Sequence, residues 1–199
     1  MLTDCADPLA EAGAETRAVG DQGHGEGQVV RQERLAVLLR THFHAVWRAV
    51  RRFGVPSGSA EDAAQEVFIV LASKLDDVQE GKERQYLYAV AARVAANARR
   101  SSIHRHENPG DEPVFDATSP LPDAERLLAQ KRRRELLDRI LDTLTQDLRT
   151  AFVLFELEDL SVPEIAEVLQ IPTGTVASRL RRAREQFGAT LSRTQGRLK

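Results

Sequence analysis

The stretch S-V-P-E-I-A-E-V-L-Q-I-P-T-G-T-V-A-S-R-L-R-R-A-R-E, residues 161–185, predicts two helices joined by a tight turn. Ser161 and Glu164 have the spacing of a capping box, in which each residue satisfies backbone groups at the start of a helix. Pro172 ends this first helix, because the residue before a proline is pushed out of the helical conformation. A second helix is expected to follow at once, capped by Thr173 or Thr175.

The second helix, from Thr173 to about Phe187, has one apolar side and one arginine side. At about 100° per residue, its apolar residues fall within a narrow arc: they are Val176, Leu180, Ala183 and Phe187. The opposite side carries Ser178, Arg181 and Arg182, with Arg179 on the flank. Arginines pair with guanine edges or grip phosphates, so the pattern is typical of a helix-turn-helix that reads duplex DNA. The alternative is a solvated arginine-rich surface on an ordinary helical hairpin.

Charge is distributed unevenly along the 199 residues, although the formal net charge is only −2. Residues 172–199 carry seven Arg and Lys against one acidic residue, and residues 1–28 carry six acidic residues against Arg17. This separation predicts an acidic tail and a basic docking surface. Membrane insertion is not expected, because no apolar run approaches spanning length and no signal peptide pattern is present. The single cysteine, Cys5, excludes an internal disulfide framework, so a cytoplasmic protein is expected.

Upstream of the helix-turn-helix, the sequence predicts an all-α fold of two small helical domains joined by a flexible linker. Helices are expected over about 30–53, from Ser59 or Ala60 to Leu75, and over about 83–101. Leu35, Leu39, Phe43, Val46, Val50 and Phe53 share one face of the first helix. The predicted organisation is a disordered acidic extension (1–28), a helical domain (29–103), a linker (104–122) and the helix-turn-helix domain (123–199).

Two separate blocks of the chain resemble the extracytoplasmic-function type of the sigma-70 family. The first is A-E-D-A-A-Q-E-V-F, residues 60–68, with Y-L-Y-A-V-A-A-R-V-A-A-N-A-R-R, residues 86–100, and it is similar to sigma region two. The second runs from L-D-T-L-T-Q-D-L-R through the helix-turn-helix to R-A-R-E and is similar to sigma region four. The resemblance implies an RNA polymerase sigma factor, which directs core polymerase to promoters and starts transcription.

The resemblance implies that the second predicted helix docks on the beta-prime clamp helices of bacterial core polymerase, and that region four docks on the beta flap. When Ala64, Val67 and Phe68 are buried, the helix turns its other side outward. That side is the candidate polymerase-binding site, Asp62, Gln65, Glu66 and Ile69. An isoleucine among exposed acids indicates an interface, although a solvated face with one stray apolar residue is the alternative.

The two promoter elements are assigned to two further surfaces. Holding an extruded base and a single strand calls for aromatic side chains beside a basic track. The residues that resemble the minus-ten reading segment are Tyr86, Tyr88, Arg93, Arg99 and Arg100; the tyrosines could equally be packing residues. The residues expected at the minus-thirty-five element are Thr175, Ser178, Arg179, Arg181 and Arg182.

The family resemblance also implies an anti-sigma factor as a partner. No cofactor and no metal are expected, because His42 and His44 point in different directions on a helix, and His104 and His106 lack further ligands. No catalytic constellation is visible, so the chain is not expected to be an enzyme. Two rivals remain open: a stand-alone helix-turn-helix transcriptional regulator, and an adaptor whose arginine helix grips an acidic protein.

Overall fold

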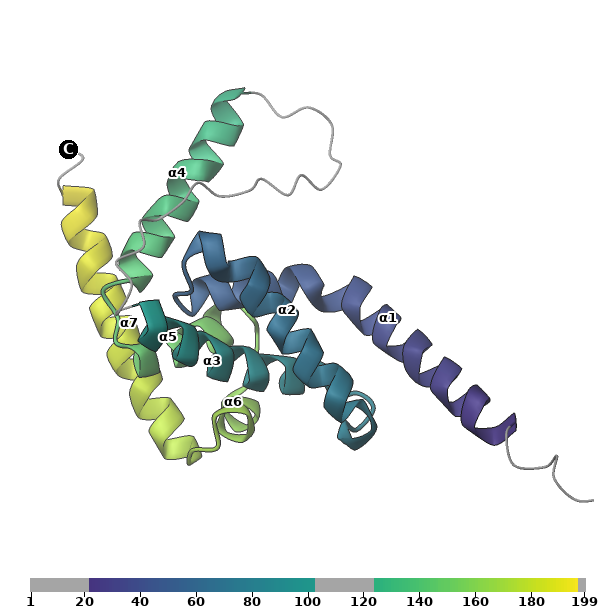
Figure 1. The fold of residues 1–199 in the computed structure, drawn as a ribbon. Coiled ribbons are helices and arrows are strands. Elements are labelled where there is room, and N and C mark those ends of the chain that lie inside the picture. Colours follow the sequence, from purple (N-terminus) through teal and green to yellow (C-terminus); the bar gives the residue numbers. More distant parts are fainter. Residues whose placement is uncertain (1–21, 103–123, 197–199) are drawn as a thin grey trace, which may run out of the picture.

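The computed structural model describes residues 22–102 and 124–196, and all regular structure in those ranges is helical (Figure 1). The elements are α1 (Gln22–Arg52), α2 (Ser57–Lys74), the short 3-10 helix η1 (Leu75–Asp77), α3 (Glu83–Ser102), α4 (Ala124–Leu141), α5 (Gln146–Glu156), α6 (Val162–Leu169) and α7 (Thr173–Gly196). The expected all-α fold, with a helix-turn-helix formed by α6 and α7, is confirmed. None of the described helices is long and apolar enough to cross a membrane.

Helices α1, α2 and α3 pack on one another and form the first helical unit. The stripe predicted for α2 is buried: Ala64 and Val67 are fully inaccessible to solvent, and Phe68 is 5% exposed. Between α1 and α2 the chain turns at Gly54, whose φ of +101° is readily adopted only by glycine. Pro56 then stands at the N-cap of α2 and presets the extended backbone that leads into the helix.

Helices α4 to α7 form the second unit, in which α5 packs along α7. The predicted apolar side of α7 faces this core, with Val176 and Ala183 fully buried and the ring of Phe187 stacked on Phe152 at 4.8 Å between centroids. At the start of α6, the amide and the hydroxyl of Ser161 both donate to the carboxylate of Glu164, at 2.8 and 2.6 Å. The predicted capping box is therefore formed.

Three helix predictions differ from the structure. Helix α1 begins at Gln22, within the extension predicted to be disordered, and residues 1–21 lie outside the described residues. Leu39, expected on the buried face of α1, is 42% exposed, and Leu38 is buried instead. Helix α7 continues to Gly196, beyond the expected end near Phe187. The linker prediction, 104–122, falls outside the described residues.

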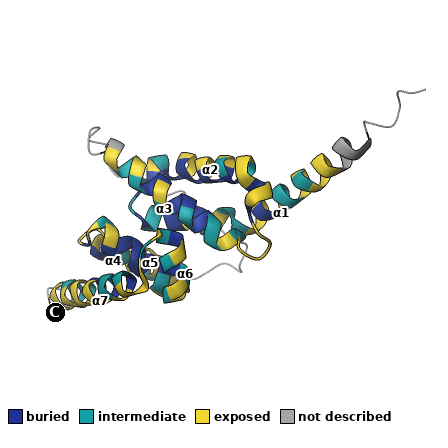
Figure 2. Ribbon diagram, turned by 90° about the horizontal axis from the view of Figure 1, so that it is seen from below, coloured by how far each residue is buried: buried dark blue, intermediate teal, exposed yellow. Residues whose placement is uncertain are grey.

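The two helical units lie against each other. Helix α3 contacts both α5 and α6, and the C-terminal end of α1 contacts α5. In Figure 2 the dark blue, buried part of α3 lies between the rest of the first unit and the α5–α6 pair. The far ends of α1 and α4 project away from this centre (Figure 1). The relative placement of the two units could not be predicted from the sequence.

Candidate nucleic-acid interface

The exposed side of α7 carries the residues predicted to read a DNA duplex. Arg181 and Arg182 are exposed, Thr175 and Ser178 are partly buried, and the Ser178 hydroxyl donates to the Thr175 carbonyl at 2.9 Å. In the first turn of α7, the amides of Thr175 and Val176 donate to the carbonyl of Pro172. The side chains of Thr175, Ser178, Arg181 and Arg182 all lie in the half of α7 that follows the turn.

Ion pairs hold several α7 arginines in place. Arg179 donates to Asp147 at the start of α5, and the guanidinium of Arg181 lies 2.7 Å from Glu185 one turn later. Arg184 lies 2.6 Å from Glu156 and over the ring of Phe155, 4.9 Å from its centroid. Exposed pairs of this kind are worth little in water, so a phosphate can replace a carboxylate at small cost.

The capping box at α6 makes stability depend on pH. Hydrogen bonds from the side chain and then the backbone of Ser161 lower the pKa of Glu164 below its ordinary value of 4.5, with a further contribution from Gln85. Because the pKa is lowered in the folded chain, the stabilisation is fully present above the ordinary value and is lost as the pH falls through the lowered one. Wild type should therefore be more stable than Glu164→Gln at neutral pH, by less than about 1 kcal/mol.

Thermal melts of the two proteins between pH 7 and pH 3 measure this difference, which should disappear at the acid end. Glu167→Gln, on the same helix, is the control, because the carboxylate of Glu167 is 66% exposed and pairs only with Lys82 at 3.4 Å. A Glu164→Gln difference that stayed constant down to pH 3 would contradict the pH dependence.

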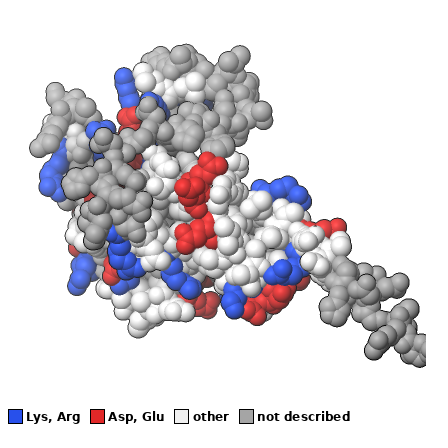
Figure 3. Space-filling view, in the orientation of Figure 1, with Lys and Arg blue, Asp and Glu red and all other residues white. Residues whose placement is uncertain are grey.

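The predicted polymerase-binding face of α2 is a continuous exposed surface. Asp62, Gln65, Glu66 and Ile69 are all exposed. Ile69 is 69% exposed, more than any other large apolar side chain of the described residues. Figure 3 shows acidic side chains gathered over α2 with uncharged surface around them. An apolar side chain placed among carboxylates suits a partner surface that is basic with an apolar pocket.

The residues predicted for the minus-ten element divide into two groups. Arg93 and Arg100 are exposed on α3, and Tyr86 is half-buried. By contrast, Tyr88 is 2% exposed, and its hydroxyl donates to Glu158 of the second unit at 2.5 Å. Burial, and then the Glu158 carboxylate, raise the pKa of Tyr88 to about 12. In this conformation Tyr88 faces protein rather than solvent.

Arg99 is also directed toward the second unit. Its guanidinium donates to the Phe53 carbonyl at 3.5 Å and to the side chain of Gln146 on α5. Arg99 and Tyr88 therefore do not share an accessible surface with the other three predicted residues in this conformation. The physical reason is that α5 and α6 cover this part of α3.

A groove of about 500 Å³ lies where the loop before α3 meets α6. The first unit contributes Lys82, Tyr86 and Arg93, and the second contributes Glu167 and Gln170. Gln170 ends α6 in a left-handed conformation, with φ 54° and ψ 45°, and its amide donates back into the helix.

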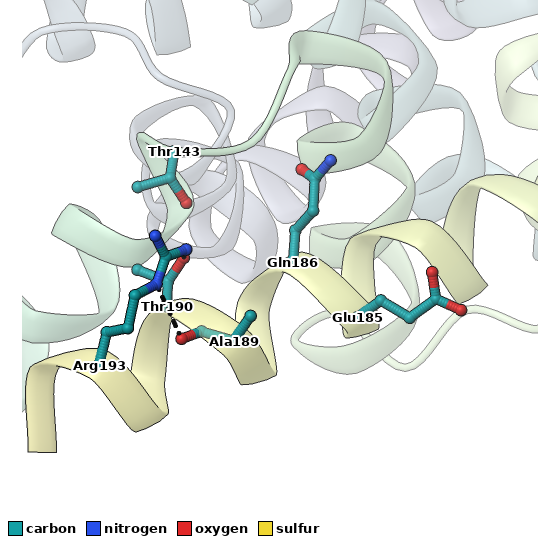
Figure 4. Close-up of a pocket in the computed structure, with 6 residues that line it drawn as sticks. All are labelled: Thr143, Glu185, Gln186, Ala189, Thr190 and Arg193. Carbon is teal, nitrogen blue, oxygen red and sulfur yellow. Dashed lines mark hydrogen bonds between the residues drawn. The ribbon is translucent and has the colours of Figure 1, made fainter. Parts of the chain in front are cut away.

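A second groove, of about 380 Å³, runs beside α7 and is shown in Figure 4. Its lining includes Thr143, Glu185 and Arg193, whose guanidinium donates to the Ala189 carbonyl at 3.2 Å. It holds a single carboxylate and no nucleophile–base pair. Over residues 22–102 and 124–196, no cluster of His, Cys, Asp and Glu could hold a metal ion.

Sequence reasoning missed two buried charged residues, Arg149 and Glu158. Arg149 is 2% exposed and Glu158 is 5% exposed, and both contact the first unit. Burial lowers the pKa of the Arg149 guanidinium, while the hydrogen bond to Asp142 opposes this effect. The available signal was an arginine inside the otherwise apolar run of α5, since a charge at such a position needs a buried partner.

Comparison with known proteins gives matches to both units. Residues 38–103 match the family described as Sigma-70 region 2, and residues 134–187 match the family described as Sigma-70, region 4. The chain is 32% identical over 162 residues to the ECF RNA polymerase sigma-E factor of Escherichia coli (strain K12), covering 77% of this chain and 84% of that protein. It is also 32% identical over 152 residues to the ECF RNA polymerase sigma factor SigE of Mycolicibacterium smegmatis, with 75% and 58% covered.

Two solved structures have a similar fold. CnrH, in complex with the cytosolic domain of CnrY, aligns with a TM-score of 0.59 at 24% identity, over 81% of this chain and 89% of that chain. The sigma factor RpoE of Bartonella quintana, in complex with the anti-sigma factor NepR, aligns with a TM-score of 0.56 at 18% identity, over 77% and 94%.

Proposed function

Since this chain belongs to the extracytoplasmic-function sigma factors of the sigma-70 family and is an RNA polymerase sigma factor, we propose that it docks on bacterial core polymerase through α2. Docking uses the exposed face made by Asp62, Gln65, Glu66 and Ile69 against the beta-prime clamp helices. The second unit docks on the beta flap. The observation that carries this proposal is Ile69, a large apolar side chain 69% exposed among carboxylates.

Helix α7 reads the minus-thirty-five element as a duplex. Arg181 and Arg182 reach base edges or phosphates, and Ser178 and Thr175 add shorter polar contacts near the turn. Arg179, which is drawn toward Asp147, is placed to grip a phosphate at the edge of the groove. The geometry is that of a helix-turn-helix whose second helix enters the major groove.

Helix α3 and the loop before it hold the minus-ten element as an opened strand. Tyr86 offers a ring for an unstacked base, and Arg93 and Arg100 lie along the exposed side of the same helix for the phosphates. Tyr88 and Arg99 join this surface only when the second unit moves away. The chemistry of RNA synthesis belongs to the polymerase, so the chain itself is not an enzyme and needs no cofactor.

The chain acts in the cytoplasm, where core polymerase and promoter DNA are found. An anti-sigma factor is a further partner, as NepR is for the sigma factor RpoE, whose fold is similar. The competing function, a stand-alone helix-turn-helix regulator, leaves the exposed face of α2 without a role.

Transcription reconstituted with sigma-free bacterial core polymerase tests the proposal. The purified chain should produce transcripts that start at a fixed distance from a shared two-part motif across a library of promoter sequences. Specific binding to a duplex without any transcript would instead favour the stand-alone regulator.

Replacing Arg182 with alanine should weaken binding to the minus-thirty-five duplex by about 1–3 kcal/mol, which is the contribution of a bidentate arginine–base contact. Fluorescence anisotropy with matched and scrambled duplexes measures the loss, and it should be larger for the matched sequence. Arg193→Ala is the control, because Arg193 is exposed on the same helix but lies well beyond the turn. Equal losses of affinity for the two variants would contradict the assignment of a base contact to Arg182.

A further inference from the structure

The contact between the two units is centred on Glu158, in the loop between α5 and α6. Its carboxylate accepts from Arg52 of α1 at 2.8 Å and from the hydroxyl of Tyr88 of α3 at 2.5 Å. Its backbone carbonyl accepts from Arg84 of α3. Because the side chain is 6% exposed, the carboxylate has exchanged water for partners that belong to the other unit. Separating the units removes all three partners at once.

A second contact is made by Arg149 of α5. Its guanidinium donates to the carbonyls of Arg51 and Arg52 at the C-terminal end of α1, where the last carbonyls have no partner from a following helical turn; the Arg51 carbonyl also accepts from the Gly54 amide. A cation at a helix C-terminus is also favoured by the helix dipole. Gly54 leaves room for both guanidinium groups here, since a Cβ there would lie 2.8 Å from a guanidinium nitrogen of Arg99 and 3.2 Å from the guanidinium carbon of Arg149.

Two further pairs lie at the rim, beside the predicted minus-ten surface. The Gln85 amide donates to Glu164 at 2.6 Å, and the ammonium of Lys82 lies 3.4 Å from Glu167. These pairs fix α6 over the start of α3. They also close one side of the groove that contains Tyr86 and Arg93.

The closed arrangement is too small to reach two promoter elements. Elements centred near positions −35 and −10 are about 25 base pairs apart, which is about 85 Å of duplex at 3.4 Å per base pair. Helix α7, with 24 residues, is only about 36 Å long at 1.5 Å per residue. Its recognition residues follow directly on α6, which contacts α3. Both surfaces therefore belong to one compact body that cannot span the distance.

We propose that Glu158, Arg149 and their partners form an interdomain latch that holds the free sigma factor closed and must open before both promoter elements are bound. This inference rests on the proposed function. The latch lowers the fraction of molecules competent for the polymerase–promoter complex, and apparent affinity falls in proportion to that fraction. Opening the latch also exposes Tyr88 and Arg99, so the minus-ten surface is completed by the same movement.

Glu158→Gln tests the latch, because it keeps the shape of the side chain and removes the charge that pairs with Arg52. Glu156→Gln is the matched control: it removes a carboxylate two residues earlier whose partner, Arg184, belongs to the same unit. Dyes attached at Ser73→Cys on α2 and Gln186→Cys on α7, in a Cys5→Ser background, report the separation of the units by single-molecule energy transfer. Unchanged binding of the isolated minus-thirty-five duplex shows that the second unit remains folded.

The expected result is a low-transfer population at least about tenfold larger for Glu158→Gln than for wild type or Glu156→Gln, since a charged hydrogen bond is lost. The apparent Kd for core polymerase on promoter DNA with an opened minus-ten strand should fall by a similar factor. An unchanged transfer distribution overturns the latch, and so does a larger open population with an unchanged Kd. If wild type itself yields no promoter-dependent transcript, the proposed function is wrong, and the proposed role of the latch in promoter binding is wrong with it.

Discussion

Phe53→Ala is expected to lower the free energy of unfolding by about 3–5 kcal/mol, the range for removing a buried aromatic side chain. Phe53 is fully buried just after α1, and its amide continues the helix by donating to the Ala49 carbonyl at 2.8 Å. The loss includes both the apolar area returned to water and the cavity left in the core. Urea unfolding followed by circular dichroism measures it as a lower midpoint.

Leu39→Ala is the control for this substitution, since the side chain belongs to the same helix and is 42% exposed. Its cost should stay within about 0.5 kcal/mol, as for other surface substitutions. The comparison also decides which side of α1 faces the core. Equal losses for the two variants would place Leu39 in the core, as the helical spacing alone predicted.

Ile69→Asp is expected to reduce transcription with core polymerase by at least about thirtyfold, which corresponds to an interface hot spot of about 2 kcal/mol. The residue is 69% exposed, so the fold should be unaffected. An unchanged melting temperature would show that the loss of transcription is not caused by destabilisation of the protein. The added carboxylate stands beside Asp62 and Glu66 and cannot enter an apolar pocket. Affinity for core polymerase, measured by competition with a second sigma factor, should fall with transcription.

The control is Val37→Asp, which places the same charge on another exposed β-branched residue. Val37 is 51% exposed on α1 and lies just outside the segment that matches sigma region 2. Transcription by this variant should remain within about twofold of wild type. If Ile69→Asp transcribed equally well, polymerase docking would have to use another face of the first unit.

Local patterns predicted the parts of the fold that depend on one helix and its nearest neighbours. The stripe of α2, the capping box of Ser161 and Glu164, and the apolar side of α7 all follow from spacing along a single helix. Leu39 shows the limit of that reasoning. Helical spacing says which residues share a face, but the packing of the other helices decides which face is buried: Leu35 and Leu38 pack in the core, and Leu39 beside them stays exposed.

For the candidate sites too, only the features that depend on a single helix could be predicted. The exposed positions of Ile69 and Arg182 could be predicted, because each follows from the buried side of its own helix. The burial of Tyr88 and Arg99 could not, since it is caused by the second unit, which lies far away in sequence. Glu158 gave no signal of its own, because a carboxylate in a turn between two helices is ordinarily solvated.

The contacts of Glu158 imply that the two halves of this sigma factor are not interchangeable modules. Consider a chimaera that joins residues 38–103 to a region four with no carboxylate at the place of Glu158. Arg52 and Tyr88 would then lose their hydrogen-bond acceptor, and the two units of the free hybrid would separate more often than those of this protein. Promoter specificity could be exchanged by grafting only α7, whose exposed arginines lie outside the interdomain contact, while the restraint on the free protein stayed in place.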